Sequence, residues 1–164
     1  MSRLDSFIRR LKAQKVLIEH AASLIGDVPG PILELGLGVA RTYDHLRALL
    51  PDREIFAFDN VIVAPIDLLP DAHHLIMGEI RETLAFCGPR VGARAALMHN
   101  DIGSGDEIHN AATRAWLAPL VPPRMAPGGI VITSFTMELA GYEKLTVPPE
   151  VPANRYHLYR APRG

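Results

Sequence analysis

The sequence lacks several features that would assign it to a defined class of protein. It has one cysteine, Cys87, which excludes an intramolecular disulfide framework and a cysteine-rich zinc site. No apolar run approaches transmembrane length, and the polar N-terminal residues lack the apolar core of a signal peptide. The formal net charge is −1, so composition gives no global electrostatic case for binding nucleic acid or an anionic membrane. We therefore expect a cytoplasmic protein.

The composition that remains is that of an ordinary globular domain. Hydrophobic residues make up 48% of the 164 residues and charged residues 21%. We expect residues 1–164 to form a single domain, which is long enough for a proper core. Within it, residues 1–28 hold a leader helix and residues 136–164 a short C-terminal region.

The chain is organised around the segment from Pro31 to Leu46, PILELGLGVARTYDHL. Its apolar start, Ile32–Leu35, predicts a buried parallel strand. A glycine turn follows at 36–40, and apolar residues three or four apart predict a helix over about 41–50. The glycines let the backbone approach a ligand closely, and the start of the helix presents unpaired N–H groups. The segment therefore predicts a nucleotide-type binding site.

Small differences in this turn indicate the kind of ligand. A dinucleotide fingerprint, G-x-G-x-x-G, needs a third glycine where the chain has Arg41, and a phosphate-binding G-x-x-x-x-G-K-[ST] loop is absent. Glu34 stands two residues before Gly36, where a carboxylate suits a cationic or amine-bearing ligand and opposes a pyrophosphate. The pattern E-x-G-x-G-x-A resembles the first motif of the class I S-adenosylmethionine-dependent methyltransferases, with Ala40 in place of the commoner third glycine.

An acid ends the next predicted strand, which covers residues 54–59. Asp59 follows the glycine turn by about 20 residues, the position at which nucleotide-binding α/β folds place a ribose-binding carboxylate. A carboxylate can accept hydrogen bonds from both ribose hydroxyls. The alternative is that Asp59 is an ordinary turn acid or helix cap, and we favour the ligand role.

A third strand is predicted over residues 73–79, before a helix that starts at Ile80. In the resembled family, an acid and the residue after it contact adenine at this place, which implies that role for Glu79 and Ile80. Glu79 could instead only cap the helix. His73 and His74 could suggest a metal, but adjacent side chains on a strand point to opposite faces, so we expect surface residues and no metal site.

The fourth strand, residues 94–101, is predicted to end where the reaction would occur. Ligands of doubly wound sheets bind beyond the carboxyl ends of the strands, at the topological switch point. His99, Asn100 and Asp101 fall there. If the acceptor needs a base, His99 or Asp101 is the candidate, and His109 is a second choice. The alternative for His99 is burial on the wrong face of the strand.

Two further amphipathic helices are predicted, one before these strands in the sequence and one after them. Residues 2–25 carry apolar Leu4, Phe7, Ile8 and Leu11 on one face and mostly basic side chains, including Arg10, on the other. Such a helix could bind a membrane or a partner, but we expect it to pack on the edge of the sheet. A helix from Asp106 to about Pro119 should pack through Ile108, Ala112, Ala115, Trp116 and Leu120.

The C-terminal region predicts an antiparallel hairpin, from stretches 144–147 and 155–161. The resembled family normally has a helix between the fifth strand, 130–135, and this hairpin. Only residues 137–142 are available here, so we expect that helix to be short or missing. The weaker cover of the sheet would make a homodimer plausible through exposed apolar surface.

Together these features predict an α/β fold, a Rossmann-like, doubly wound, mostly parallel sheet flanked by helices, with a C-terminal antiparallel hairpin. The resemblance covers residues 30–135 well and the tail loosely. It implies S-adenosyl-L-methionine as cofactor and the following cofactor-binding residues: Glu34, Leu35, Gly36, Gly38, Arg41, Thr42, Asp59, Asn60, Gly78, Glu79, Ile80, Asn100 and Asp101.

We expect a methyltransferase that acts on a small-molecule acceptor. Residues 133–136 hold no Asp-Asn pair, which argues against a catalytic metal, and residues 99–102 lack the aromatic-plus-proline tetrapeptide of nucleic-acid amine methyltransferases. A cofactor-binding protein of the same fold that transfers nothing is the alternative. A dinucleotide-dependent oxidoreductase is a third possibility, which Arg41 and Glu34 oppose.

Overall fold

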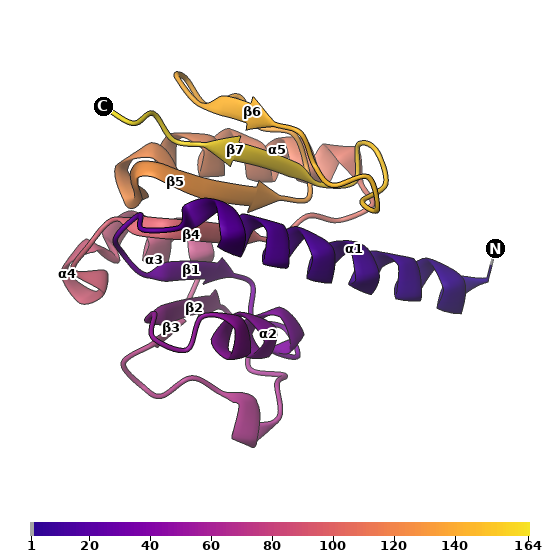
Figure 1. Cartoon of the computed structure of the whole chain (residues 1–164). Helices are drawn as coiled ribbons and strands as arrows, with labels where there is room; N and C mark the ends of the chain where they lie inside the picture. Colours follow the sequence, from indigo (N-terminus) through magenta and orange to yellow (C-terminus); the bar gives the residue numbers. More distant parts are fainter. Residues whose placement is uncertain (1) are drawn as a thin grey trace.

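Seven strands form one sheet in the computed structural model, which describes residues 2–164 (Figure 1). The strands are β1 (Ile32–Leu35), β2 (Ile55–Asp59), β3 (Leu75–Met77), β4 (Ala95–Asn100), β5 (Met125–Thr133), β6 (Glu143–Leu145) and β7 (His157–Arg160). Their order is β3-β2-β1-β4-β5-β7-β6. The first five in this order are parallel, and β7 runs antiparallel to both of its neighbours. The predicted fold and hairpin are confirmed.

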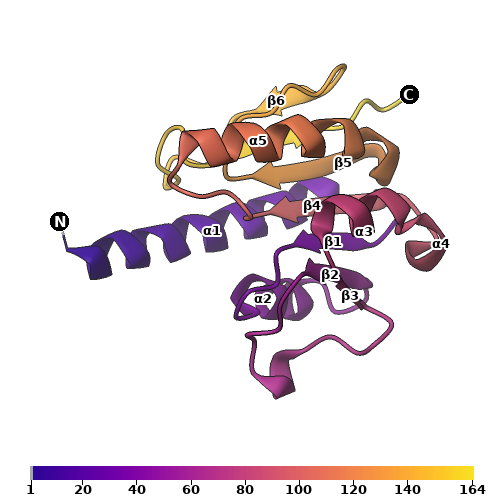
Figure 2. The same cartoon turned by 180° about the vertical axis from the view of Figure 1, so that it is seen from behind.

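Helices cover both faces of the sheet. They are α1 (Arg3–Ile25), α2 (Arg41–Leu49), α3 (Ile80–Phe86), the single turn α4 (Gly88–Val91) and α5 (Glu107–Leu117), with 3-10 turns η1 (Ile66–Leu68), η2 (Ala118–Leu120) and η3 (Pro122–Arg124). Figure 1 shows α1 and α2 in front of the sheet, and Figure 2 shows α3 and α5 on the opposite face.

The central strands are buried on both faces because each face of the sheet packs against its own hydrophobic core. In β1, Ile32 packs with α1 and α2, whereas Leu33 and Leu35 pack in the core under α3 and α5. Alternation along the strand therefore places Glu34 on the α1 side. The chain runs outward from β1 to β3 and then returns to β4 beside β1, so the switch point lies between the carboxyl ends of β1 and β4.

The placement of α1 differs from the expected one. The helix is continuous and lies across a face of the sheet, over β4 and β5, instead of on its edge (Figure 1). Its later half supplies the contacts, because Leu17, Ile18 and Ala21 are buried there. Leu4 and Ile8 are exposed, at 66% and 41% of their surface, because the first turns extend past the body of the protein.

The packing face of α5 was predicted correctly only in part: Trp116 and Leu120 pack against the core, whereas Ile108, Ala112 and Ala115 are exposed. Ile108 is 83% exposed, and the buried residues are Asn110, Thr113 and Leu117. The Asn110 side chain is bonded twice to the backbone of Ser104, through Oδ1 and Nδ2, both at 2.8 Å. These two bonds turn the polar Asn110 inward, and apolar periodicity alone could not indicate that.

The segment between β5 and β6 contains no helix within residues 134–142, as predicted. The expected exposed apolar surface is absent from it, however, because Phe135, Met137 and Leu139 are buried and fill the space of the missing helix. The Met137 amide donates to Tyr159 Oη at 3.0 Å and fixes this irregular stretch against β7.

Candidate functional site

The glycine turn after β1 has a backbone that most residues could not adopt. Gly36 has φ 89° and Gly38 has φ 52°, both in the left-handed region. A Cβ on Gly36 would meet Ile102 Cγ2 at 2.8 Å, so a side chain there is excluded by space as well as by conformation. The turn thus brings bare backbone to the carboxyl end of the sheet, directly before α2.

A cavity of about 720 Å³, which we call the main cleft, opens beside this turn. Its lining includes these predicted site residues: Gly36, Gly38, Arg41, Thr42, Asp59, Asn60, Glu79, Ile80 and Asp101. They come from the ends of β1, β2, β3 and β4 and the helix starts that follow. The volume is within the usual range of small-ligand sites, about 300–1,000 Å³. The structure therefore gathers most of the predicted site in one place.

Asp59 is held in a fixed orientation at the end of β2. Its Oδ2 accepts from the Gly38 amide at 2.9 Å, and its Oδ1 accepts from the amides of Asn60 and Val61 at 2.8 and 3.2 Å. Oδ1 thus uses both of its lone pairs, whereas Oδ2 keeps one for a further donor. Asn60 Nδ2 also donates to Glu79 Oε1 at 3.3 Å, which links the turns after β2 and β3.

Glu34 and His99 form a buried pair behind the main cleft. His99 Nδ1 lies 2.7 Å from Glu34 Oε2, and the Thr42 hydroxyl donates to Glu34 Oε1. Burial alone would lower the pKa of His99, but the adjacent Glu34 carboxylate outweighs this and raises the pKa above its ordinary value. Neither side chain lines the cleft. The pair fixes Thr42, at the start of α2, to β1 and β4.

Asp101 is the acid that reaches the main cleft from β4. It accepts a hydrogen bond from Gln14 of α1, and burial raises the pKa of its carboxyl group. Its neighbour Asn100 is fully buried: Nδ2 donates to Thr133 Oγ1 at 3.2 Å, and Oδ1 accepts from the Ile102 amide at 3.1 Å. Asn100 thus shapes the backbone after β4. Leu35 is buried, and Gly78 turns the chain between β3 and Glu79.

Sequence reasoning missed the contribution of α1 to the cleft. Arg10 and Gln14 line it, although the prediction had placed Arg10 on the outer basic face. A signal was available, since Arg10, Gln14, Ile18 and Ala21 are spaced four, four and three residues apart on one side of the helix. The cleft also includes Trp116 of α5 and His109, the second choice of base.

A second cavity of about 600 Å³, which we call the side pocket, adjoins the main cleft and shares Arg10 and Asp101 with it. Its other walls are the glycine-containing loop 103–105, the segment 134–136 after β5, and residues 154–157 before and at the start of β7. Arg10 Nε and Ser134 Oγ are buried and have no hydrogen-bond partner within residues 2–164.

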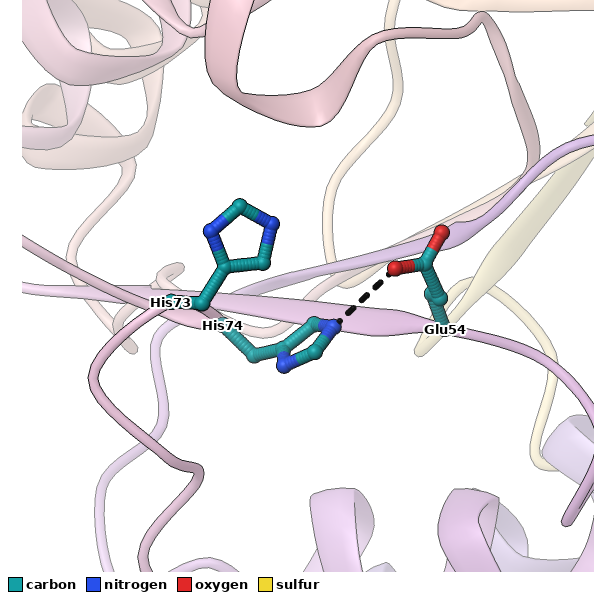
Figure 3. Close-up of side chains that lie close together, drawn as sticks. All are labelled: Glu54, His73 and His74. Carbon is teal, nitrogen blue, oxygen red and sulfur yellow. Dashed lines mark hydrogen bonds and ion pairs between the residues drawn. The ribbon is translucent and has the colours of Figure 1, made fainter.

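The reason given for dismissing His73 and His74 is wrong. The two residues lie in a turn before β3 instead of on the strand, because β3 begins only at Leu75. Their ring centroids are 5.0 Å apart, and His74 Nε2 lies 3.3 Å from Glu54 Oε1 at the amino end of β2 (Figure 3). One ligand atom from each of the three side chains lies within 4.8 Å of the others. This cluster is at the opposite end of the sheet from the main cleft.

Comparison with known proteins agrees with the geometry of the main cleft. A family model described as S-adenosyl-L-methionine methyltransferase matches residues 1–161. The crystal structure of an S-adenosyl-L-methionine methyl transferase from Silicibacter pomeroyi DSS-3 is 40% identical, with 100% of this chain and 99% of that chain covered and a TM-score of 0.89. No curated protein matches the chain.

More distant structures share the fold alone. CalS11, a TDP-rhamnose 3'-O-methyltransferase of calicheamicin biosynthesis, is 20% identical, with 96% of this chain and 83% of that chain covered and a TM-score of 0.63. The pyocyanin biosynthetic protein PhzM is 14% identical, with 94% and 56% covered and a TM-score of 0.59. The match over nearly the whole sequence and the 40% identical relative establish that the chain belongs to the S-adenosyl-L-methionine methyltransferase family.

Proposed function

We propose that this enzyme holds S-adenosylmethionine in the main cleft and transfers its methyl group to a small molecule in the side pocket. The observation that carries the proposal is the orientation of Asp59, which three backbone amides fix at the rim of the main cleft. A carboxylate fixed in this way can accept from a ribose hydroxyl at Oδ2 without further ordering, and from the second hydroxyl if that group replaces one of the two amides at Oδ1. The bound cofactor supplies an activated methyl group on a sulfonium.

The other residues of the main cleft fit the remaining parts of the cofactor. The bare backbone at Gly36 and Gly38 lines the main cleft and leaves room there for the methionine portion. Glu79 can accept from the amino group of adenine, and Ile80 can pack on its ring. We assign Glu34 a positioning role, because its carboxylate is used by Thr42 and His99.

The acceptor site is proposed from the connection between the two cavities. Asp101 and Arg10 line both, so a molecule in the side pocket would contact the same residues as the methyl-donating end of the cofactor. The side pocket is bounded on several sides and has a volume suited to a small molecule. The charged side chains in its lining, which include Arg10, Glu107 and Arg114, favour an acceptor with polar groups.

Asp101 is the better supported of the two candidate bases. It lines both cavities, and its raised pKa favours accepting a proton from an acceptor hydroxyl or amine. His99 lines neither cavity, and its Nδ1 is bonded to Glu34, so we propose that it positions the end of β4. A catalytic metal is not part of this proposal, which needs only orientation of the acceptor and a base.

The acceptor class can be tested by following a labelled methyl group. Purified enzyme would be incubated with methyl-labelled S-adenosylmethionine and fractionated cell extract. Label in the small-molecule fraction is expected, whereas label in RNA, DNA or protein would contradict the proposal. Asp101→Asn should lower the turnover number by about 10²–10⁴-fold, the usual contribution of a general base. Asp67→Asn, at an exposed acid of η1 that lines neither cavity, is the matched control.

We also propose a homodimer in which the projecting first turns of α1 pack against a second copy. These turns extend past the body of the protein (Figure 2). Leu4, Phe7 and Ile8 lie in them and are exposed. Sedimentation of the wild type and of a Leu4→Ser/Ile8→Ser variant tests this. The variant should be monomeric at concentrations where the wild type is dimeric, and a monomeric wild type would contradict it.

The proposed setting is the cytoplasm. None of the helices within residues 2–164 is long and apolar enough to span a membrane. Support for a reducing compartment comes from Cys87, a free thiol that is buried and donates to the Leu84 carbonyl at 3.3 Å. Nucleic acid is not a proposed partner, because the net charge is −1. Fractionation of cells that produce the protein would test the location.

A further inference from the structure

We propose that Glu54, His73 and His74 bind a divalent transition-metal ion, with zinc as the expected one. The cluster is at the amino ends of β2 and β3, away from the main cleft (Figure 3). β2 and β3 are parallel neighbours, so the residues that precede them lie side by side. One ligand atom from each side chain can be chosen so that all three lie within 4.8 Å of one another.

The spacing of the first two ligand atoms matches tetrahedral zinc. His74 Nε2 lies 3.3 Å from Glu54 Oε1. With bonds of about 2.0–2.1 Å and tetrahedral angles, two zinc ligands are about 3.3–3.4 Å apart. The ring of His73 completes a set of two imidazoles and one carboxylate after a modest rotation, which its exposed position allows. A fourth position remains for water.

A further carboxylate orients the central ligand. Both oxygens of Asp71 lie close to His74 Nδ1, at 2.9 and 2.8 Å, so Asp71 binds this ring nitrogen and leaves Nε2 for an ion. Nε2 is thereby directed toward Glu54. A carboxylate on the second ring nitrogen is the usual support of a metal-binding histidine, because it fixes the tautomer and raises the basicity of the ligand.

The backbone of the turn is fixed before any ion binds. Asp71 Oδ1 accepts from the amides of His73 and His74 at 2.9 and 3.1 Å. From the other side, the Arg90 guanidinium donates to the carbonyl of His73 at 2.9 Å and to that of Leu75 at 3.1 Å. The His74 ring also packs against Phe56, at 4.9 Å between centroids. The backbone of the turn and the His74 ring therefore have little conformational freedom left to lose on binding, whereas the exposed side chains of His73 and Glu54 must still be ordered.

The ligand set indicates the class of ion. Imidazole nitrogens favour zinc, cobalt, nickel and copper, whereas calcium and magnesium prefer sites made of oxygen. The ion would cross-link β3, a three-residue strand at the edge of the sheet, to β2. We therefore infer a structural ion that stabilises this edge, since an ion that binds only the folded chain raises its stability.

An ordinary ion pair is the competing explanation of the same contacts. His74 lies between Asp71 and Glu54, and that arrangement needs no metal. The two explanations differ at His73, whose ring belongs to the ligand set but whose contribution to the hydrogen bonds of this turn is through the backbone alone. A metal site requires the His73 ring, and the ion pair does not.

The test is titration of the full-length, tag-free protein with zinc, followed by calorimetry, and with cobalt, followed by its visible absorption. We expect one ion per chain, the intense bands of tetrahedral cobalt, and a higher melting temperature with zinc. His73→Ala should weaken zinc binding at least ten-fold, and His74→Ala and Glu54→Gln should do the same. His20→Ala, on α1, is the control and should bind as the wild type does.

Each contrary result has a defined meaning. Absence of saturable binding at one ion per chain would overturn the proposal, as would an affinity that is unchanged in His73→Ala. His74→Ala could lose stability by breaking the ion pair, so His73→Ala is the deciding variant. Its metal-free melting temperature should fall only slightly, through the lost ring contacts with Phe56 and His74, and the rise with zinc should be lost.

Discussion

His99 Nδ1 of β4 lies 2.7 Å from Glu34 Oε2 of β1, and both side chains are almost completely buried. The two strands meet at the switch point of the sheet, so the pair joins them directly behind the main cleft. Thr42 extends the contact to α2. The pair therefore supports the glycine turn without contributing a surface to the cleft.

Removing one member of this pair should lower the free energy of unfolding. Glu34→Gln would leave His99 buried without a counter-charge, and loss of one partner of a buried pair typically costs about 3–5 kcal/mol. The free energy of unfolding, measured with urea, should fall by that amount. Glu138→Gln, at an exposed glutamate, is the control and should change it by less than about 0.5 kcal/mol. Equal stability of Glu34→Gln and wild type would show that the pair is not charged.

The same pair predicts a dependence of stability on pH. The pKa of His99 is raised in the folded protein, whereas an unfolded histidine titrates near pH ~6.5. The stabilisation is therefore complete below about pH 6.5 and is lost as the pH rises through the folded pKa. The difference in unfolding free energy between wild type and His99→Gln should shrink as the pH rises above about 6.5. A difference that stays constant or grows over this range would contradict the assignment.

Gly36→Ala tests the need for bare backbone in the turn. The substitution meets a φ of 89° and an Ile102 Cγ2 atom at 2.8 Å from the new Cβ. Binding of S-adenosylhomocysteine should weaken by at least ten-fold, about 1.4 kcal/mol, because the turn must shift. Gly105→Ala is the matched control, since nothing lies within 4 Å of its Cβ position. Undiminished binding by Gly36→Ala would mean that the turn does not contact the cofactor.

Arg53 should be important for folding although it is far from the cleft. Its guanidinium donates to the carbonyls of Val28, Gly30 and Gly26 at 2.8, 2.9 and 2.9 Å, and so holds the loop between α1 and β1. A lysine cannot reach all three with one ammonium group. Arg53→Lys should lose about 2 kcal/mol of unfolding free energy in urea. Arg47→Lys, at a half-exposed arginine, is the control, and equal losses in both would argue against a specific clamp.

The sheet and the ligand-facing turns could be predicted because their signals are local. An apolar run, two glycines and an acid identify β1, the turn and Asp59 without knowledge of distant residues. The parallel strands that neighbour one another then follow from the alternation of strands and helices. For this reason most of the residues predicted for the cofactor do line the main cleft.

The parts that were missed depend on contacts between distant segments. Gln14 is buried because Asp101, far away in sequence, accepts its hydrogen bond, and polar residues are otherwise expected outside. Asn110 faces inward because of the loop at Ser104. The prediction that His73 and His74 point to opposite faces assumed that both lie on the strand. Asp71 accepts from their two amides and forms a turn, so the strand begins only at Leu75.

The central claim is that the methyl donor binds the main cleft through Asp59, and calorimetric titration tests it most directly. Wild type should bind S-adenosylmethionine and S-adenosylhomocysteine at micromolar concentration, about −8 kcal/mol, and should not bind NADH. Asp59→Ala should weaken both by at least ten-fold, while Asp67→Ala, an exposed acid of η1, should bind as wild type does. Unchanged affinity in Asp59→Ala, or binding of NADH in place of the methyl donor, would contradict the account.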